Sequence, residues 1–349
     1  MRGNFGLKLA TMVCLLMALA TAKGSALGDR LEIKGDGSTF AYPMYTKWIQ
    51  EYEKVDPSVR FTYQSNGSGA GIHDVMIGSV DFAGTDGPLN NVQMLDFSTH
   101  RNCELLHFPT ALGAAVPVYN IPGVKQLNFT PQALAGIYLG NITTWNDPDI
   151  AKVNPGVSLP ANKIVVVHRK DGSGTTYVWT DYLSKVSPEW HELAGLGVSV
   201  LWPTGIGGKG NEGVAQLVEN TPYSIGYVEL TYAVAKGLSY GSVRNRSGEF
   251  IKADSASVTA AAAAQAAHSM SDDFRFSITD APGKDAYPIS SFTWILVPSV
   301  TPDPAKREAL IGFLRWGLTK GQDLLEPLSY ARLPDAVIAK EDKAIEKIK

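Results

Sequence analysis

The sequence has little cysteine, no large excess of either charge and no long apolar run beyond its first residues. Only two cysteines, Cys14 and Cys103, occur among 349 residues, which excludes a scaffold held together by disulfides. The formal net charge of −3 provides no basic surface for nucleic acid or for a membrane. No stretch after residue 26 approaches the roughly 20 apolar residues of a transmembrane helix, so the chain must fold around its own core.

Motifs for metal binding and catalysis are also missing. The histidines, which show no metal-ligand spacing such as H-x-x-x-H, are His73, His100, His107, His168, His191 and His268. No G-x-S-x-G elbow surrounds Ser68 or Ser173. GIGGKGN at 205–211 differs from a Walker loop, because Pro203 and Gly210 replace its leading glycine and its final Ser or Thr. We therefore expect no metal, no cofactor and no catalytic residue.

The first residues have the pattern of a secretory signal. Arg2 and Lys8 precede an apolar run from Leu9 to Ala20, and Ala20-Thr21-Ala22 forms an A-x-A cleavage pattern. A transmembrane anchor is the alternative, but about 12 apolar residues are too few to span a bilayer. We expect residues 1–26 to be a removed signal peptide and the mature protein to be periplasmic.

The two cysteines bear on the same question. Lipid attachment at Cys14 is a third option for the N-terminus, which Val13 disfavours because a small residue is wanted there. Removal of residues 1–26 leaves Cys103 without a partner. We expect Cys103 to be buried as a small apolar side chain.

Short apolar strands alternate with amphipathic helices, which is typical of an α/β protein with largely parallel strand pairing. The length of the chain predicts two lobes. Expected strands lie at residues 31–33, 59–63, 164–167, 224–230 and 294–298. Expected helices lie at residues 44–52, 72–76, 177–183, 214–218, 259–267 and 306–319. Ser255 or Ser257 is expected to cap the alanine-rich helix at 259–267.

Three loops share one construction: GDGSTF at 35–40, NGSGAG at 66–71 and KDGSGTT at 170–176. Each follows a strand and opens a helix. Glycine allows close approach of the backbone, the first helical N–H groups lack partners, and the hydroxyls add donors. One such loop is more often a capped turn, but three loops at the carboxyl ends of strands predict an anion site.

Arg169 is the cation beside the third loop. Its guanidinium can donate two parallel hydrogen bonds to a tetrahedral oxyanion, and Asp171 can hold it in place. The alternative is an ordinary surface salt bridge. The loop context favours binding.

Asp86 lies in DFAGTDGPL, where a turn residue is the simplest interpretation. A carboxylate repels a fully ionised anion, but it accepts a short hydrogen bond from a protonated oxyanion. Phosphate keeps a proton near neutral pH and sulfate does not. Asp86 would therefore select phosphate and reject sulfate.

The ordered segments GDGSTFAYPMYTKW, YQSNGSGAGI, DFAGTDGPL, HRKDGSGTT, WPTGIGGKGNEGVA and SIGYVE resemble the periplasmic phosphate-binding proteins of the high-affinity phosphate ABC transporter. The resemblance runs from about residue 31 to 335. It implies an α/β periplasmic binding protein fold with two lobes, a hinge and a ligand cleft between them. Lobe 1 would comprise 27–110 and 288–349, and lobe 2 would comprise 111–287, with crossings near 110–114 and 287–291.

The resemblance also implies the residues that contact phosphate. Asp86 would accept the proton, and Asp171 keeps the role of orienting the arginine that its place beside Arg169 indicates. The implied ligands are Thr39, Phe40, Ser68, Asp86, Arg169, Ser173, Gly174 and Thr175. Departures from the family pattern, such as Thr85 and Gly87 around Asp86, keep the donors and the carboxylate.

The function implied is capture of inorganic phosphate and its delivery, by a monomer, to the membrane permease subunits of an ABC transporter with a cytoplasmic ATPase. Two other classes stay open from the residues alone. A secreted phosphatase would need a nucleophile or a metal, and a binder of sulfate or molybdate would not need Asp86. A surface or signalling role without transport also stays open.

Overall fold

The structure, a computed structural model, describes residues 30–269 and 271–349. The expected signal peptide at 1–26 and Cys14 lie outside the described residues. Cys103 is half-buried and free. In the part of the chain that the structure describes, no helix has the length and apolar character needed to cross a membrane.

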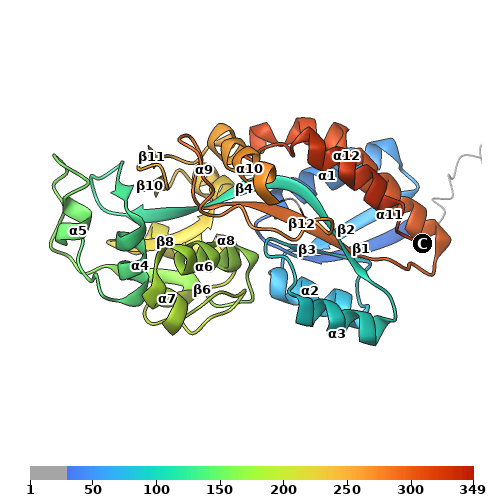
Figure 1. Ribbon diagram of the computed structural model, residues 1–349, viewed down its shortest axis with the longest axis horizontal. Helices are drawn as coiled ribbons and strands as arrows, with labels where there is room; N and C mark the ends of the chain where they lie inside the picture. The colour runs from blue at the N-terminus through green and yellow to red at the C-terminus, as the bar shows by residue number, and fades with distance from the viewer. Residues whose placement is uncertain (1–29, 270) are drawn as a thin grey trace, which may run out of the picture.

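The strands belong to one large sheet that runs through both lobes and to one small sheet (Figure 1). Their bounds are β1 (Leu31–Gly37), β2 (Val59–Gln64), β3 (Phe82–Thr85), β4 (Leu105–Asn120), β5 (Asn128–Phe129), β6 (Val165–Arg169), β7 (Ile206–Gly208), β8 (Ser224–Glu229), β9 (Ser239–Tyr240), β10 (Ser242–Arg244), β11 (Phe250–Ile251) and β12 (Ser290–Pro298). The large sheet has the order β2-β1-β3-β12-β4-β8-β6-β7, with β9 on β4, and the small sheet has the order β11-β10-β5.

The expectation of largely parallel pairing is wrong for the centre of the large sheet. β1 pairs in parallel with β2 and β3, and β6 pairs in parallel with β7 and β8. In contrast, β12 is antiparallel to β3 and β4, and β4 is antiparallel to β8 and β9. The two long central strands run in opposite directions because the chain leaves lobe 1 along β4 and returns along β12.

β4 carries the chain from one lobe to the other. Its residues up to Ala114 pair with β12, and Ala115 to Asn120 pair with β8. The change of partner lies at the end of the first expected crossing, and β12 begins within the second. We propose that lobe 1 comprises 27–110 and 288–349 and that lobe 2 comprises 111–287.

The helices cover both faces of the sheet in each lobe. Their bounds are α1 (Tyr42–Val55), α2 (Ser68–Ile77), α3 (Asn91–Arg101), α4 (Pro131–Leu139), α5 (Pro148–Ala151), α6 (Gly174–Val186), α7 (Pro188–Leu193), α8 (Gly210–Asn220), α9 (Leu230–Ala235), α10 (Ser255–Ser269), α11 (Pro304–Leu318), η1 (Lys320–Leu324), η2 (Glu326–Leu328) and α12 (Asp335–Ile345). In lobe 1, α2 and α3 lie on one face of the sheet, and α1, α11 and α12 lie on the other (Figure 1).

Each of the six expected helices begins two to four residues before its expected range. Side-chain caps explain two of these starts. α6 begins at Gly174 instead of Tyr177, because the Ser173 hydroxyl caps it by accepting from Thr176 N at 3.1 Å. α10 is capped by the side chain of Asp254, which accepts from Ser257 N at 2.8 Å. Ser257 completes the box by accepting from Asp254 N at 3.0 Å.

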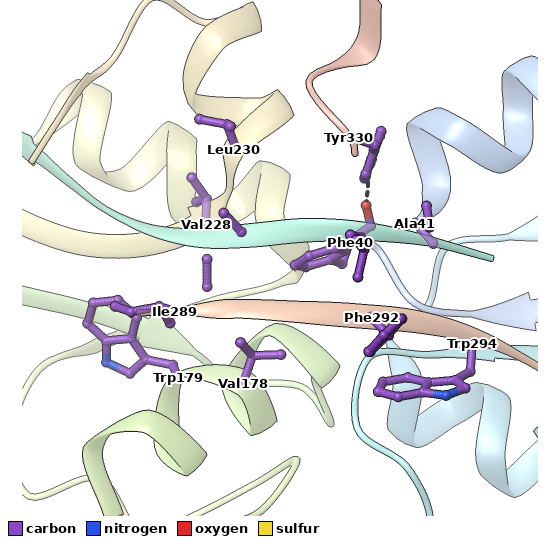
Figure 2. Close-up of a cluster of buried hydrophobic side chains, with 14 of the residues drawn as sticks. Phe40, Ala41, Val178, Trp179, Val228, Leu230, Ile289, Phe292, Trp294 and Tyr330 are labelled. Carbon is purple, nitrogen blue, oxygen red and sulfur yellow. Dashed lines mark hydrogen bonds between the residues drawn. The ribbon is translucent and has the colours of Figure 1, made fainter. Parts of the chain in front are cut away.

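A continuous hydrophobic core passes through both lobes. In Figure 2, Trp179 and Val228 from lobe 2 lie along the same pair of central strands as Phe292 and Trp294 from lobe 1. All four side chains are at most 1% exposed. Burial of such side chains stabilises each lobe, and the shared strands hold the lobes together at the hinge.

Candidate functional site

The three glycine and hydroxyl loops meet at the junction of the lobes. In lobe 1, Gly67 N donates to Gly37 O at 2.8 Å, which joins the first loop to the second. Gly69 N donates to Gly172 O at 2.9 Å, which joins the second loop to the third across the two lobes. A Cβ added at Gly174 would lie 2.3 Å from Asp86 Oδ2. The close contact of the loops therefore requires glycine at position 174. Because the second and third loops touch across the two lobes, the lobes are in a closed arrangement.

Backbone donors gather where the loops meet. The first N–H groups of a helix have no partner within the helix, and α2 and α6 both begin in these loops. Within the described residues, no hydrogen-bond acceptor is found for the backbone N–H groups of Thr39, Phe40, Ser68, Gly174 and Thr175. Such a set of N–H groups forms a concave donor site that suits an oxyanion.

Three tyrosine hydroxyls hold the backbone of the first loop. Tyr63 donates to Ser38 O at 3.1 Å, and Tyr232 donates to Thr39 O at 2.7 Å. Tyr330 donates to Phe40 O at 2.5 Å, as Figure 2 shows.

The peptide bonds are trans, so each carbonyl points opposite to the N–H group of the following residue. The tyrosines therefore turn the N–H groups of Thr39 and Phe40 away from themselves. Burial raises the pKa of Tyr63, Tyr232 and Tyr330, so these hydroxyls stay neutral donors at neutral pH.

Arg169 ends β6 and is 2% exposed. Its Nε donates to Asp171 Oδ1 at 2.8 Å and its Nη2 donates to Asp171 Oδ2 at 2.5 Å. The ion pair predicted from the sequence is therefore present and bidentate. Nη1 points toward the third loop, where it lies 3.4 Å from Thr175 Oγ1.

Hydrogen bonds within the protein hold both partners of this ion pair in place. Burial raises the pKa of Asp171, but the hydrogen bonds and charge of Arg169 outweigh burial and hold that pKa below its usual range. Asp171 Oδ1 also accepts from Gly210 N at 3.0 Å. The carboxylate of Asp171 is thus occupied by the protein itself, and Arg169 is fixed in orientation.

Asp86 follows β3 and is 1% exposed. Ser38 Oγ lies 2.6 Å from its Oδ1 and 2.7 Å from its Oδ2, and Oδ1 also accepts from Thr293 Oγ1 at 2.7 Å. Burial raises the pKa of Asp86 to about 6, in spite of these hydroxyl donors and the charge of Arg169. Asp86 therefore has only neutral donors in direct contact, and its Oδ2 faces the third loop at Gly174.

The serine hydroxyls at the site differ in their partners. Ser68 Oγ is buried and makes no well-formed hydrogen bond in the described structure, although it lies close enough to Asp86 to oppose the rise of that pKa. Ser173 Oγ accepts from Thr176 N, which leaves its hydrogen free to donate. A buried hydroxyl without a partner is costly, and a bound oxyanion would satisfy Ser68.

Sequence reasoning missed several residues that support this site. Ser38 lies inside the GDGSTF loop, and Asn211 lies inside GGKGNEG. Asn211 contacts Thr39 and Thr175. Thr293 and the tyrosines come from distant segments that carry no recognisable motif. Among the described residues, no group of three or more His, Cys, Asp or Glu side chains could hold a metal.

Comparison with known proteins points to one family. The model of the PBP superfamily domain matches residues 20–320. The chain is 42% identical over 310 residues to a phosphate-binding protein PstS of Xylella fastidiosa, covering 88% of this chain and 83% of the relative. It is 41% identical over 332 residues to a phosphate-binding protein PstS of Pasteurella multocida, covering 95% and 94%.

Solved structures agree on the fold. A phosphate-binding protein from Stenotrophomonas maltophilia superposes with a TM-score of 0.70 at 17% identity, over 90% of this chain and 94% of the other. At that identity, the likeness speaks for the two-lobed fold alone.

Proposed function

Because this chain belongs to the PBP superfamily and, within it, to the phosphate-binding proteins named PstS, we propose that it captures inorganic phosphate between its two lobes. The proposed contacts are Thr39, Phe40, Ser68, Asp86, Arg169, Ser173, Gly174 and Thr175. Asp171 has the role of orienting Arg169. The chain is a binding protein of a phosphate ABC transporter and not an enzyme.

The observation that carries this proposal is the pairing of many donors with one buried acceptor. Unpaired N–H groups and Arg169 favour an anion, and Asp86 faces them with no cation in direct contact. Asp86 would repel sulfate, but it would accept a hydrogen bond from the P–OH group of phosphate. Burial of the site strengthens each of these interactions, since the effective dielectric constant is low.

Export and delivery complete the proposal. Residues 1–26 would direct the chain across the inner membrane, and the mature periplasmic protein would act as a monomer. Contacts from both lobes to one phosphate would shift the population toward the closed arrangement. The closed form would then dock on the permease subunits of a transporter with a cytoplasmic ATPase.

The experiment is calorimetry on mature protein freed of phosphate. Phosphate and then sulfate would be titrated near neutral pH. We expect tight phosphate binding and no heat from sulfate. Binding of sulfate, or no binding of phosphate, would overturn the proposed role of Asp86. A chromogenic phosphate ester tests the phosphatase class, and turnover of that ester would contradict a purely binding role.

A further inference from the structure

Asn211 joins the two lobes at the candidate site. It lies in the first turn of α8 and is 0% exposed. Its side-chain Nδ2 donates to Thr39 Oγ1 at 2.8 Å and to Thr175 Oγ1 at 3.0 Å. Thr39 belongs to lobe 1, and Thr175 belongs to the anion loop of lobe 2. One amide group therefore contacts a hydroxyl on each side of the junction.

The orientation of this amide is fixed by the backbone. Asn211 Oδ1 accepts from Glu229 N at 2.9 Å. A backbone N–H group can only donate, so the oxygen of the amide must face Glu229 and the NH2 group must face the threonines. Both hydrogens of Nδ2 are thus directed at the two hydroxyl oxygens.

The two threonine hydroxyls then have a set polarity. Thr39 Oγ1 also lies 3.3 Å from Asn211 N, and Thr175 Oγ1 also lies 3.4 Å from Arg169 Nη1. Each hydroxyl oxygen accepts from donors that the protein supplies. The hydroxyl hydrogen must therefore point elsewhere, and the phosphate of the proposed site would be its acceptor.

We infer that Asn211 is a positioning residue, which orients the hydroxyl groups of Thr39 and Thr175 so that they can only donate to the anion. Because the two threonines come from different lobes, Asn211 orients both of them only when the lobes are closed. The inference rests on the proposed function, because the anion is taken to be phosphate. If phosphate carried a second proton, neither threonine oxygen could accept a hydrogen bond from it, because both oxygens already accept from Asn211. Asn211 therefore limits how many protons the site accepts, while Asp86 accepts one.

Two variants of similar side-chain size test this role. In Asn211→Leu the threonine hydroxyls can rotate and accept, and in Asn211→Asp the carboxylate would accept from both hydroxyls and turn them away from phosphate. Calorimetry at pH 8 should show about a tenfold to hundredfold loss of phosphate affinity for Asn211→Leu. Asn211→Asp should lose more, since it also adds a charge that repels the ligand.

The pH profile separates polarity from simple packing. At pH 6 more of the phosphate carries a second proton, which freed hydroxyls can accept. The loss in Asn211→Leu should therefore be at least about threefold smaller at pH 6 than at pH 8. Four titratable residues bond Asn211 or a partner or chain neighbour of it, and this variant leaves them unchanged: Arg169, Asp171, Glu229 and Tyr232. The carboxylate of Asp86, which acts electrostatically on Glu229, is also unchanged.

Asn220→Ala is the matched control, because Asn220 ends the same helix and is exposed, and its side chain donates to Gln216 O. It should bind phosphate as the wild type does. Equal losses at both pH values in Asn211→Leu, or full affinity in Asn211→Asp, would overturn the role of Asn211. Failure of the wild type to bind phosphate would instead overturn the proposed function.

Discussion

The two lobes each bring one aspartate to the candidate site. The two carboxylates differ in their hydrogen-bond partners and in the direction in which their pKa values are shifted. Asp171 in lobe 2 is held by Arg169 through two hydrogen bonds, and these lower its pKa against the effect of burial. Asp86 in lobe 1 contacts hydroxyls only, and burial raises its pKa to about 6. The same residue type is a fixed counterion in one lobe and an available acceptor in the other.

A carboxylate in an anion site would normally repel the ligand. The difference between Asp171 and Asp86 explains how this candidate site can contain both. In lobe 2 the negative charge of Asp171 is paired within the protein, so the lobe still presents the donors of Arg169. In lobe 1, the remaining acceptor capacity of Asp86 toward the third loop would, in the proposed site, be used by the ligand. A protonated oxyanion satisfies both lobes at once, whereas a fully ionised one satisfies only lobe 2.

The largest expected effect is the loss of the cation in lobe 2. Arg169→Ala removes the guanidinium and leaves Asp171 without its partner, so phosphate would face an unpaired carboxylate. We expect phosphate binding to weaken by several kcal/mol, or about a thousandfold, in calorimetry. Lys170→Ala, which changes the exposed neighbouring cation, is the control. Unchanged affinity in Arg169→Ala would exclude Arg169 as a ligand.

The next effect concerns selectivity in lobe 1. Asp86→Asn replaces an acceptor by a neutral amide that can donate to a fully ionised anion. The ratio of phosphate to sulfate affinity should fall by about a hundredfold, since one charge-assisted hydrogen bond and one repulsion are both lost. Asp81→Asn is a matched control from the opposite end of β3, where the carboxylate bonds Lys306. A ratio unchanged by Asp86→Asn would remove Asp86 as the proton acceptor.

The sequence predicts features formed by residues that are close in the chain, and it does not predict contacts between residues that are far apart in the chain. Alternation of strands and helices predicts five of the twelve strands and six of the twelve α-helices in the described chain, because hydrophobic periodicity is local. The direction of β4 against β12 is not predicted, since the paired residues are far apart and apolar runs do not specify their partners. The three anion loops are recognisable because glycine, hydroxyls and a strand end occur within a few residues.

The supporting residues of the site were not predictable for the same reason. Tyr232 is 193 residues from Thr39, and Tyr330 is 290 residues from Phe40. A buried tyrosine is usually a core residue, and only the assembled structure shows that these hydroxyls hold loop carbonyls. Asn211 lies within the GIGGKGN motif, yet its proposed role depends on two threonines from different lobes.

The two aspartates should also affect stability with opposite dependence on pH in phosphate-free protein. The raised pKa of Asp86 means that its folded form binds more protons than the unfolded chain between about pH 4 and 6. Stability from this group is thus present at low pH and is lost as pH rises through about 6. Relative to Asp86→Asn, the wild type should lose about 2 to 3 kcal/mol of unfolding free energy between pH 4 and pH 7.

Urea unfolding of both proteins at the two pH values measures this difference. Asp171→Asn sharpens the comparison, because the lowered pKa of Asp171 gives stability that is present above about pH 4 and is lost as pH falls. Asp171→Asn should therefore be more destabilising at pH 7 than at low pH. Parallel pH dependence in the wild type and Asp86→Asn would contradict the raised pKa of Asp86.

The smallest expected effect is that of Asp171→Asn on affinity, since two consequences oppose each other. Loss of the bidentate partner lets Arg169 rotate, but loss of the negative charge favours an anion nearby. Because the hydrogen bonds are buried and well aligned, we expect orientation to dominate, with about tenfold weaker phosphate binding in calorimetry. Glu212→Gln removes an exposed carboxylate of the same lobe and should leave affinity unchanged. Tighter binding by Asp171→Asn would mean that the charge of Asp171 outweighs its orienting role, and the contrast between the two aspartates would then be one of charge alone.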